Sequence, residues 1–205
     1  MQHTDEKQQN PTAERILDAA RDLFFDSGFE AVTTEALARA ASVSKTSIYK
    51  HFGNMEGVFT AVIEQAADEL AAGLPTVTPN ADAFWETLEQ FGAQLLAFIA
   101  TPYAANIHRL MMERARDHTE MTGLYYSLSF DRTQRDLAER FRQAQAQGYV
   151  AQSVCPETVA DALLCAWEGM PFRRLELGLT EEPFPDPAGR ARSVLNIFRA
   201  GIEAR

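Results

Sequence analysis

The chain has 205 residues, of which 46% are apolar and 23% are charged, and its formal net charge is −10. This composition is ordinary for a globular protein and far from that of a disordered chain. An acidic surface repels phosphate, which excludes a protein that coats nucleic acid indiscriminately. Any contact with a polyanion must therefore be local.

The first ten residues, MQHTDEKQQN, are polar and lack the apolar stretch of a secretory signal, so we expect a disordered arm over residues 1–10. No apolar run has the length that spanning a bilayer requires. The cysteines, Cys155 and Cys165, have neither the spacing of a metal knuckle nor that of a disulfide framework. We expect a cytoplasmic chain with reduced, structural cysteines and no membrane contact.

Helical patterns follow one another closely from residue 11 onward. The apolar stripe of the first helix includes Ile16 and Phe24, and Gly28 ends it. Four helices are expected in the first seventy residues or so, each beginning at a residue type that commonly caps helices. The candidate caps are Asn10 or Thr12, Thr33 or Thr34, Ser44, and Asn54. Gly73 and Pro75 then predict a break in the chain.

Longer amphipathic helices are expected beyond this break. Thr101-Pro102 and Asp186-Pro187 each place a cap before a proline, which starts a helix. The apolar spacing predicts helices over residues 84–99, 120–147, 156–177 and 187–204, whereas the segment TEEPFPDP is too rich in proline for regular structure. No strand pair or internal repeat is evident, so the sequence predicts an all-α fold.

The stretch ASVSKTSIYKHFGN, residues 41–54, contains no carboxylate although the chain is strongly acidic. Two short helices joined by a tight turn are typical of a helix-turn-helix, whose second helix enters the major groove. Small polar side chains at the start of that helix let it approach the base edges, and lysines can reach phosphates or guanine. The residues concerned are Ser44, Lys45, Thr46, Ser47 and Lys50.

Thr33 and Thr34 stand at the start of the preceding helix, where hydroxyls and backbone N–H groups can bind a phosphate. The alternative for the whole stretch is a solvated turn between two core helices, because lysine is common on exposed surfaces.

The segment FFDSGFEAVTTEALARAASVSKTSIYKHFGNMEGVF resembles the DNA-binding half of the TetR/AcrR family of bacterial transcriptional regulators. The resemblance rests on Phe-x-x-x-Gly-Phe, Thr-Thr, Leu-Ala, Val-Ser-Lys and Ile-Tyr-x-His-Phe, in that order. It implies a helix-turn-helix domain over residues 11–55 and a helical domain over residues 56–205 that binds a small molecule and dimerises. The implied partners are double-stranded operator DNA, an effector of unknown identity and a second copy of the chain.

By position, the resemblance places DNA contacts at Thr34, Ser44, Lys45, Thr46, Ser47, Tyr49 and His51. It assigns Tyr49 and His51 to backbone phosphates, and Lys45 and Thr46 to positions nearer the bases. Two departures stand out. Met55 replaces a lysine that many members carry, and Ser42 and Thr46 stand where glycine is frequent.

The second domain is rich in aromatic and sulfur side chains, most of which are expected to form its core. The resemblance and a few polar residues on apolar faces suggest an effector cavity among them. The candidate effector contacts are Phe84, Leu88, Phe91, Gln94, His108, Met111, Met112, Tyr125, Trp167 and Met170. For His108 the alternative is a hydrogen-bonded core histidine.

No metal or other cofactor is expected, because His108, Glu113 and His118 are spaced by five residues and do not share one helical face. The last two helices resemble the pair that forms the dimer interface in the family, and Ala160, Ala162, Ala166 and Gly169 would permit close helix approach. The alternative is that these helices close the core of the monomer.

Taken together, these features predict a ligand-responsive DNA-binding transcriptional regulator, usually a repressor. The alternative is a small helical enzyme or lipid-binding protein that carries a helix-turn-helix. No nucleophile motif, phosphate loop or paired-carboxylate arrangement supports an enzyme.

Overall fold

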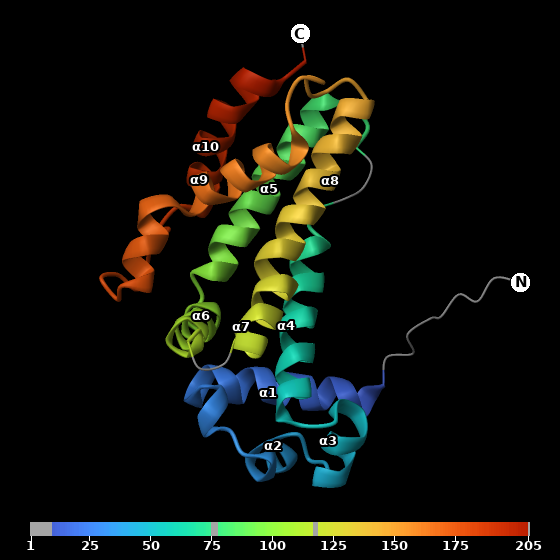
Figure 1. Cartoon of the computed structure of the whole chain (residues 1–205), viewed down its shortest axis with the longest axis vertical. Coiled ribbons are helices and arrows are strands. Elements are labelled where there is room, and N and C mark those ends of the chain that lie inside the picture. Colours follow the sequence, from blue (N-terminus) through green and yellow to red (C-terminus); the bar gives the residue numbers. More distant parts are fainter. Residues whose placement is uncertain (1–9, 75–77, 117–118, 205) are drawn as a thin grey trace, which may run out of the picture. The chain divides into compact units, whose positions relative to one another are not determined.

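The computed structural model describes residues 10–74, 78–116 and 119–204 (Figure 1). Within these ranges the regular structure is helical, and the β-type pairing is limited to an isolated bridge between Val150 and Glu203. The predicted all-α fold is therefore confirmed. The expected disordered arm lies outside the described residues except for Asn10. Among the helices described, none is long and apolar enough to cross a membrane.

The chain forms two compact units, one ending at Ile63 and the other beginning at Glu64. The first contains α1 (Pro11–Ser27), a 3₁₀ turn (Phe29–Ala31), α2 (Thr34–Ala40), α3 (Lys45–Phe52) and the beginning of α4 (Met55–Ala71). The domain limits predicted from the sequence, 11–55 and 56–205, remain a prediction.

Aromatic rings hold the first unit together. Phe24, from α1, contacts Phe29 and Phe59 with ring centroids 5.3 and 6.1 Å apart, and Phe24 and Phe59 are fully buried. Leu37 of α2 and Ile48 of α3 have no exposed surface. Burying these side chains fixes which faces of the two short helices remain outside.

The predicted capping residues begin the helices. Each accepts a hydrogen bond from a backbone N–H in the first turn, which satisfies a group that the helix itself leaves unpaired. The structure chooses Asn10 over Thr12 and Thr33 over Thr34. The other predicted caps are Ser44, Asn54, Thr101 and Asp186. Asn80, which was not predicted, caps α5 in the same way.

In its described residues, the second unit contains the end of α4 and six further α-helices. These are α5 (Ala81–Ile99), α6 (Pro102–Arg114), α7 (Thr119–Tyr126), α8 (Arg132–Ala146), α9 (Pro156–Glu176) and α10 (Pro187–Ile202). Helix α10 packs along α5, and α8 packs along α9.

The helix predicted over residues 120–147 is interrupted. A π-helical segment, Ser127–Asp131, separates α7 from α8. The hydroxyls of Ser127 and Ser129 donate to the carbonyls of Gly123 and Tyr125, four residues earlier. Such side-chain bonds compete with the regular helical ladder and accompany the local widening.

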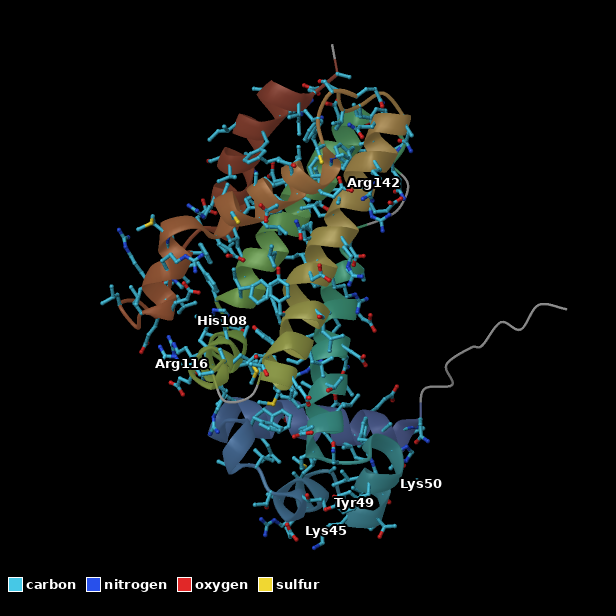
Figure 2. The ribbon with its side chains drawn as sticks, viewed as in Figure 1. Lys45, Tyr49, Lys50, His108, Arg116 and Arg142 are labelled. Atoms are coloured by element: carbon cyan, nitrogen blue, oxygen red, sulfur yellow. The ribbon has the colours of Figure 1, made fainter. Side chains whose placement is uncertain are left out.

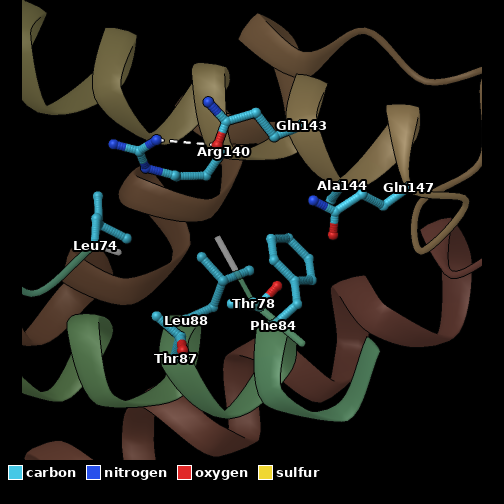
Figure 3. A pocket seen from close by; sticks show the side chains of 9 residues that line it. All are labelled: Leu74, Thr78, Phe84, Thr87, Leu88, Arg140, Gln143, Ala144 and Gln147. Carbon is cyan, nitrogen blue, oxygen red and sulfur yellow. Dashed lines mark hydrogen bonds between the residues drawn. The ribbon is translucent and has the colours of Figure 1, made fainter. Parts of the chain in front are cut away.

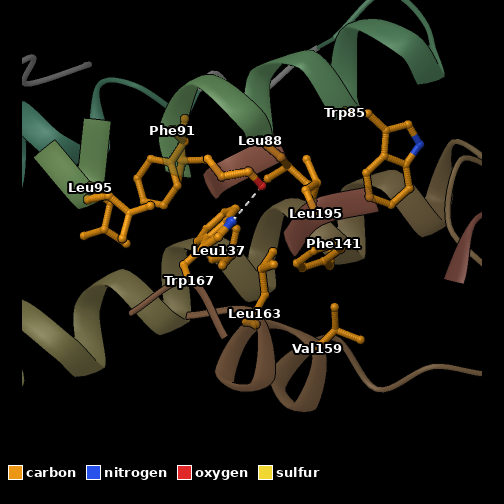
Figure 4. Close-up of a cluster of buried hydrophobic side chains, with 14 of the residues drawn as sticks. Trp85, Leu88, Phe91, Leu95, Leu137, Phe141, Val159, Leu163, Trp167 and Leu195 are labelled. Atoms are coloured by element: carbon orange, nitrogen blue, oxygen red, sulfur yellow. Dashed lines mark hydrogen bonds between the residues drawn. The ribbon is translucent and has the colours of Figure 1, made fainter. Parts of the chain in front are cut away.

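Trp167 is at the centre of the second unit and has no exposed surface (Figure 4). Its ring lies 6.2 Å from that of Phe91, and its indole Nε1 donates to the carbonyl of Ala191 on α10 at 3.1 Å. A Cβ atom at Gly92 would lie only 2.6 Å from the indole, so the absence of a side chain there lets α5 and α9 approach each other. The core therefore joins α5, α9 and α10.

Helix α9 bends sharply at Gly169, and Figure 1 shows its two segments meeting at an angle. Gly169 has φ of 51° and ψ of −152°, and Pro171 lacks the N–H that would bond to the carbonyl of Trp167. The guanidinium of Arg190 bonds to that carbonyl and to those of Ala166, at 2.9 Å, and Glu168. The helix predicted over residues 156–177 is present, but it is not continuous, because it bends at Gly169. A Cβ atom at Gly169 would lie 2.5 Å from Nη2 of Arg190, so the absence of a side chain there does let α10 approach α9 closely, as expected.

Candidate nucleic-acid interface and sensor region

The turn between α2 and α3 places residue 42 in the left-handed region. Among the described residues, Ser42 is the one non-glycine residue with a positive φ, 54°. The next amide, that of Val43, donates to the carbonyl of Ala38 at 2.9 Å and closes the turn. Serine thus adopts the geometry that glycine adopts with less strain.

Helix α3 has a polar, exposed first turn. The hydroxyl oxygen of Ser44 accepts from the backbone N–H of Ser47 at 3.1 Å, which leaves Lys45 and Thr46 projecting from the start of the helix. Ile48 is completely buried on the opposite face. The structure therefore presents one face of α3 to the outside, as a recognition helix requires.

Three long side chains project from the exposed face of α3. Lys45, Tyr49 and Lys50 are exposed on α3, and half of the surface of Tyr49 is accessible (Figure 2). His51 is half-buried, with its ring 6.2 Å from that of Phe52. Together the set offers ammonium, phenol and imidazole groups to a polyanion.

The start of α2 contributes hydroxyls. The side-chain oxygen of Thr33 accepts from the N–H of Ala36 at 3.1 Å, so this hydroxyl serves first as the helix cap. Thr34, the first residue of α2, is half-buried. The predicted DNA-contact residues therefore come from the beginning of α2 and from the exposed face of α3, within one unit.

Glu35, which the sequence analysis did not single out, pairs with Lys45. The Nζ atom of Lys45 lies 2.5 Å from Oε1 of Glu35, and both side chains are more than half exposed. The hydrogen bond and charge of this pair raise the pKa of Lys45 and lower that of Glu35. The ten-residue separation gives no sequence signal, because the contact depends on how α2 and α3 cross.

The candidate effector residues of the second unit do not form one group. Five lie in the packed interior, three are exposed and two are half-buried. The interior residues are Phe84, Leu88, Phe91, Met111 and Trp167; the exposed ones are Gln94, Met112 and Met170; His108 and Tyr125 are half-buried. Gln94, Met112 and Met170 lie on solvent faces of their helices, so the expected apolar surroundings are absent there. The effector contacts remain a prediction.

His108 lies in a polar cluster among aromatic rings. Its Nε2 atom is 2.9 Å from Oε1 of Glu176, and its Nδ1 atom is buried without a hydrogen-bond partner. The rings of Phe172 and Phe130 lie 5.5 and 5.8 Å from the imidazole. Arg173 also binds Glu176, at 2.7 Å, and lowers its pKa although burial acts in the opposite direction.

Glu168 and Tyr125 respond to the same enclosed surroundings. Burial raises the pKa of the Glu168 carboxyl to about 7; Arg173 lowers it and Glu176 raises it. Burial likewise raises the pKa of Tyr125. Neutral forms of both groups are favoured because charge is poorly solvated there.

A small cavity of about 20 Å³ lies between α5 and α8 (Figure 3). This volume has room for about one water molecule. Its wall contains two of the candidate effector residues, Phe84 and Leu88, together with Leu74, Thr78, Thr87, Arg140, Gln143, Ala144 and Gln147. Nothing in the sequence marks Arg140 as a site residue, because an arginine on an amphipathic helix is usually solvated.

No group of three or more His, Cys, Asp or Glu side chains within the described ranges could hold a metal ion. His118, considered in the sequence analysis, lies outside those ranges. Cys155 and Cys165 are free and exposed, so the expectation of structural cysteines is wrong for these side chains.

The last two helices present a mixed outer surface. Ile197 of α10 is 74% exposed, and Ala162 and Cys165 of α9 are also exposed. Ala160 is completely buried in the core of the unit. The small residues of α9 therefore divide between the monomer core and an outer face.

Comparisons with curated proteins match the first part of the chain. The HTH-type transcriptional regulator YvkB of Bacillus subtilis strain 168 is 42% identical over 55 residues, which are 27% of this chain and 29% of that protein. The HTH-type transcriptional regulator UidR of Escherichia coli K12 is 34% identical over 62 residues, covering 30% and 32%. The chain thus spans about a third of the length of these relatives.

Solved structures match nearly the whole chain. A TetR transcriptional regulator from Agrobacterium tumefaciens is 25% identical, with a TM-score of 0.80 and 96% of each chain covered. The flavonoid-responsive regulator FrrA is also 25% identical, with a TM-score of 0.69 and coverage of 95% of this chain and 98% of its own.

Family models match both units. The model for bacterial regulatory proteins of the tetR family matches residues 16–62, and the model for the C-terminal domain of AefR-like transcriptional repressors matches residues 86–200. The second match alone covers more than half of the chain. The chain therefore belongs to the TetR family of bacterial transcriptional regulators.

Proposed function

We propose that the protein is a ligand-responsive transcriptional repressor that binds operator DNA as a homodimer and releases it when an effector binds the second unit. The observation that carries this proposal is the exposed face of α3, which begins at the Ser44 cap and presents Lys45, Tyr49 and Lys50 opposite the buried Ile48. Proteins of this family are transcriptional regulators rather than enzymes. No observation favours the alternative of a helical enzyme or lipid-binding protein.

The proposed DNA contacts fall into two classes, those to backbone phosphates and those to base edges. Thr33, Thr34, Tyr49 and His51 are suited to backbone phosphates, since they offer short donors or aromatic hydroxyl and imidazole groups near the ends of α2 and α3. The first turn of α3, with Ser44, Lys45, Thr46 and Ser47, reads base edges in the major groove, and Lys50 adds a phosphate contact.

Dimerisation through α9 and α10 is part of the proposal, because members of this family form dimers and these helices offer the large exposed side chain of Ile197 beside small residues. Two-fold symmetry would place two recognition helices on half-sites of a palindromic operator. We propose that the protein acts in the cytoplasm, where bacterial DNA lies.

The descriptions of the related proteins favour repression over activation. The family model of the second unit is named for repressors, and the structurally similar SmeT is described as the repressor of a multidrug efflux pump. FasR of Mycolicibacterium smegmatis, 32% identical over 81 residues, is described as an activator. A reporter under the upstream promoter decides the sign: deletion of a repressor raises expression.

The DNA-binding proposal is tested with alanine variants of Lys45, Tyr49 and Lys50 on the DNA upstream of the protein's own gene. We expect each to weaken binding by about tenfold or more, and the lysine variants to reduce the salt slope by about 1. Arg135→Ala, an exposed change in the second unit, serves as the control. The proposal fails if all three variants bind with wild-type affinity and salt dependence.

A further inference from the structure

Arg140 places a guanidinium on the wall of the cavity between α5 and α8 (Figure 3). Its Nε atom is buried and has no hydrogen-bond acceptor, and its Nη1 atom donates to the amide oxygen of Gln143 at 3.0 Å. A buried donor without an acceptor is costly, and the cost is greater when the donor is charged. The fold supplies no acceptor for this buried N–H group, so the group is available to a molecule that binds in the cavity.

The other arginines of α8 differ from Arg140 in this respect. Each has a carboxylate partner within 4 Å: Asp68 and Asp136 for Arg132, Asp131 for Arg135, and Glu139 and Glu157 for Arg142. Within the described ranges, Arg140 has no such partner although the chain has 29 acidic residues. Its charge is thus left available to an anion from outside the chain.

The lining of the cavity suits an anionic group attached to an apolar body. It includes no Asp or Glu, and Leu74, Phe84 and Leu88 form an apolar wall opposite α8. The nearby carboxylate of Glu139 is already bound by Gln143 and Arg142. A carboxylate on Arg140 would therefore meet no like charge from the lining, and charge-assisted bonds to a guanidinium are among the strong ones.

We propose that Arg140 forms the subsite that binds the carboxylate of the effector, and that the effector is an organic acid with an apolar body directed along Leu88 and Phe84. The inference rests on the proposed function, since it assigns the chemical class of the effector. The present volume of about 20 Å³ holds a single polar atom, so the body of the acid must move side chains of the wall outward as it binds.

The test uses the full-length protein and matched probes: benzoate and hexanoate as acids, benzamide and hexan-1-ol as uncharged analogues, and hexylamine as a cation. Binding is measured by calorimetry and by the shift in melting temperature. We expect the acids alone to bind, in the millimolar range or tighter, and Arg140→Gln to weaken their binding by at least about tenfold. Arg140→Lys keeps the charge and should lose less.

Arg135→Gln, on the same helix but exposed, should bind the acids as the wild type does. The inference is overturned if the acids do not bind, if the uncharged analogues bind equally well, or if Arg140→Gln binds the acids unchanged. Upstream-DNA binding is measured in parallel without ligand. Its absence would refute the proposed function while leaving the acid subsite standing, whereas normal DNA binding without acid binding would refute the subsite alone.

Discussion

The two units keep their important polar side chains in opposite surroundings. In the first unit, Lys45 and Glu35 pair on the surface, and the caps of α2 and α3 position them without burying them. In the second unit, the partners of Arg190 and His108 are enclosed between helices. Exposed pairs contribute little to stability, whereas enclosed groups destabilise a fold when a partner is removed.

Because of this difference, substitutions in the two units should have different effects. Changes on the face of α3 should alter DNA binding and leave the fold intact. Changes to the enclosed polar groups of the second unit should alter stability first, so any effect on an effector response must be separated from unfolding. Substitutions at Arg190, Glu168 and Glu35 test this contrast between the two units.

Removing the guanidinium of Arg190 should have the largest effect. Arg190→Ala leaves the carbonyls of Ala166, Trp167 and Glu168 without their partner at the bend of α9, and we expect a loss of about 3 kcal/mol in the free energy of unfolding. Urea unfolding followed by the fluorescence of Trp85 and Trp167, both buried in the second unit, measures this loss. Arg192→Ala, which removes an exposed ion pair with Glu89, should leave the stability nearly unchanged. Equal stability of the two variants would contradict the contrast.

Neutralising Glu168 should have a smaller effect that depends on pH. Its pKa rises from 4.5 to about 7 on folding, so between these values the unfolded chain has lost the proton that the folded chain keeps, and stability falls as pH rises. Glu168→Gln removes this term. The full rise in pKa corresponds to about 3 kcal/mol, and the partial exposure of Glu168 reduces this value. We therefore expect the variant to match the wild type in stability below pH 4.5 and to exceed it by about 2 kcal/mol above pH 7. A difference that does not vary with pH would show that Glu168 ionises normally.

Neutralising Glu35 should change DNA binding and not the fold. Glu35→Gln frees Lys45 and removes a negative charge beside the DNA-facing surface, so we expect nonspecific affinity to rise by about threefold and thermal stability to stay constant. Fluorescence anisotropy with random-sequence duplex measures the affinity. Glu14→Gln, an exposed change on α1, is the control. Unchanged DNA affinity in Glu35→Gln would mean that Lys45 does not face the nucleic acid.

Much of the first unit could be predicted from the sequence, because its signals are local. Ser44 and Asn54 cap helices through atoms three residues away, and the alternation of polar residues around Ile48 marks the buried face of α3. The pairing of Lys45 with Glu35 could not be predicted, since it depends on the angle between two helices. The positive φ of Ser42 likewise follows from the turn and not from the residue type.

The second unit was less predictable because its signals are long-range. The apolar stripes gave the helices but not which residues line a cavity, and Met112 and Met170 prove to be exposed. Pro171 and Gly169 interrupt α9, yet the stripe on either side of them reads as continuous. The partner that makes the bend tolerable, Arg190, stands about twenty residues further along the chain on α10.

The bend of α9 also sets a rule for exchanging parts among related proteins. The carbonyls at the bend of α9 are hydrogen-bonded by Arg190 of α10, so the two helices must be exchanged together. A chimera that takes α9 from this chain and α10 from a relative without an arginine at the corresponding position receives a helix with three open carbonyls. Transplanting residues 156–202 as one piece keeps the bend and its cap together.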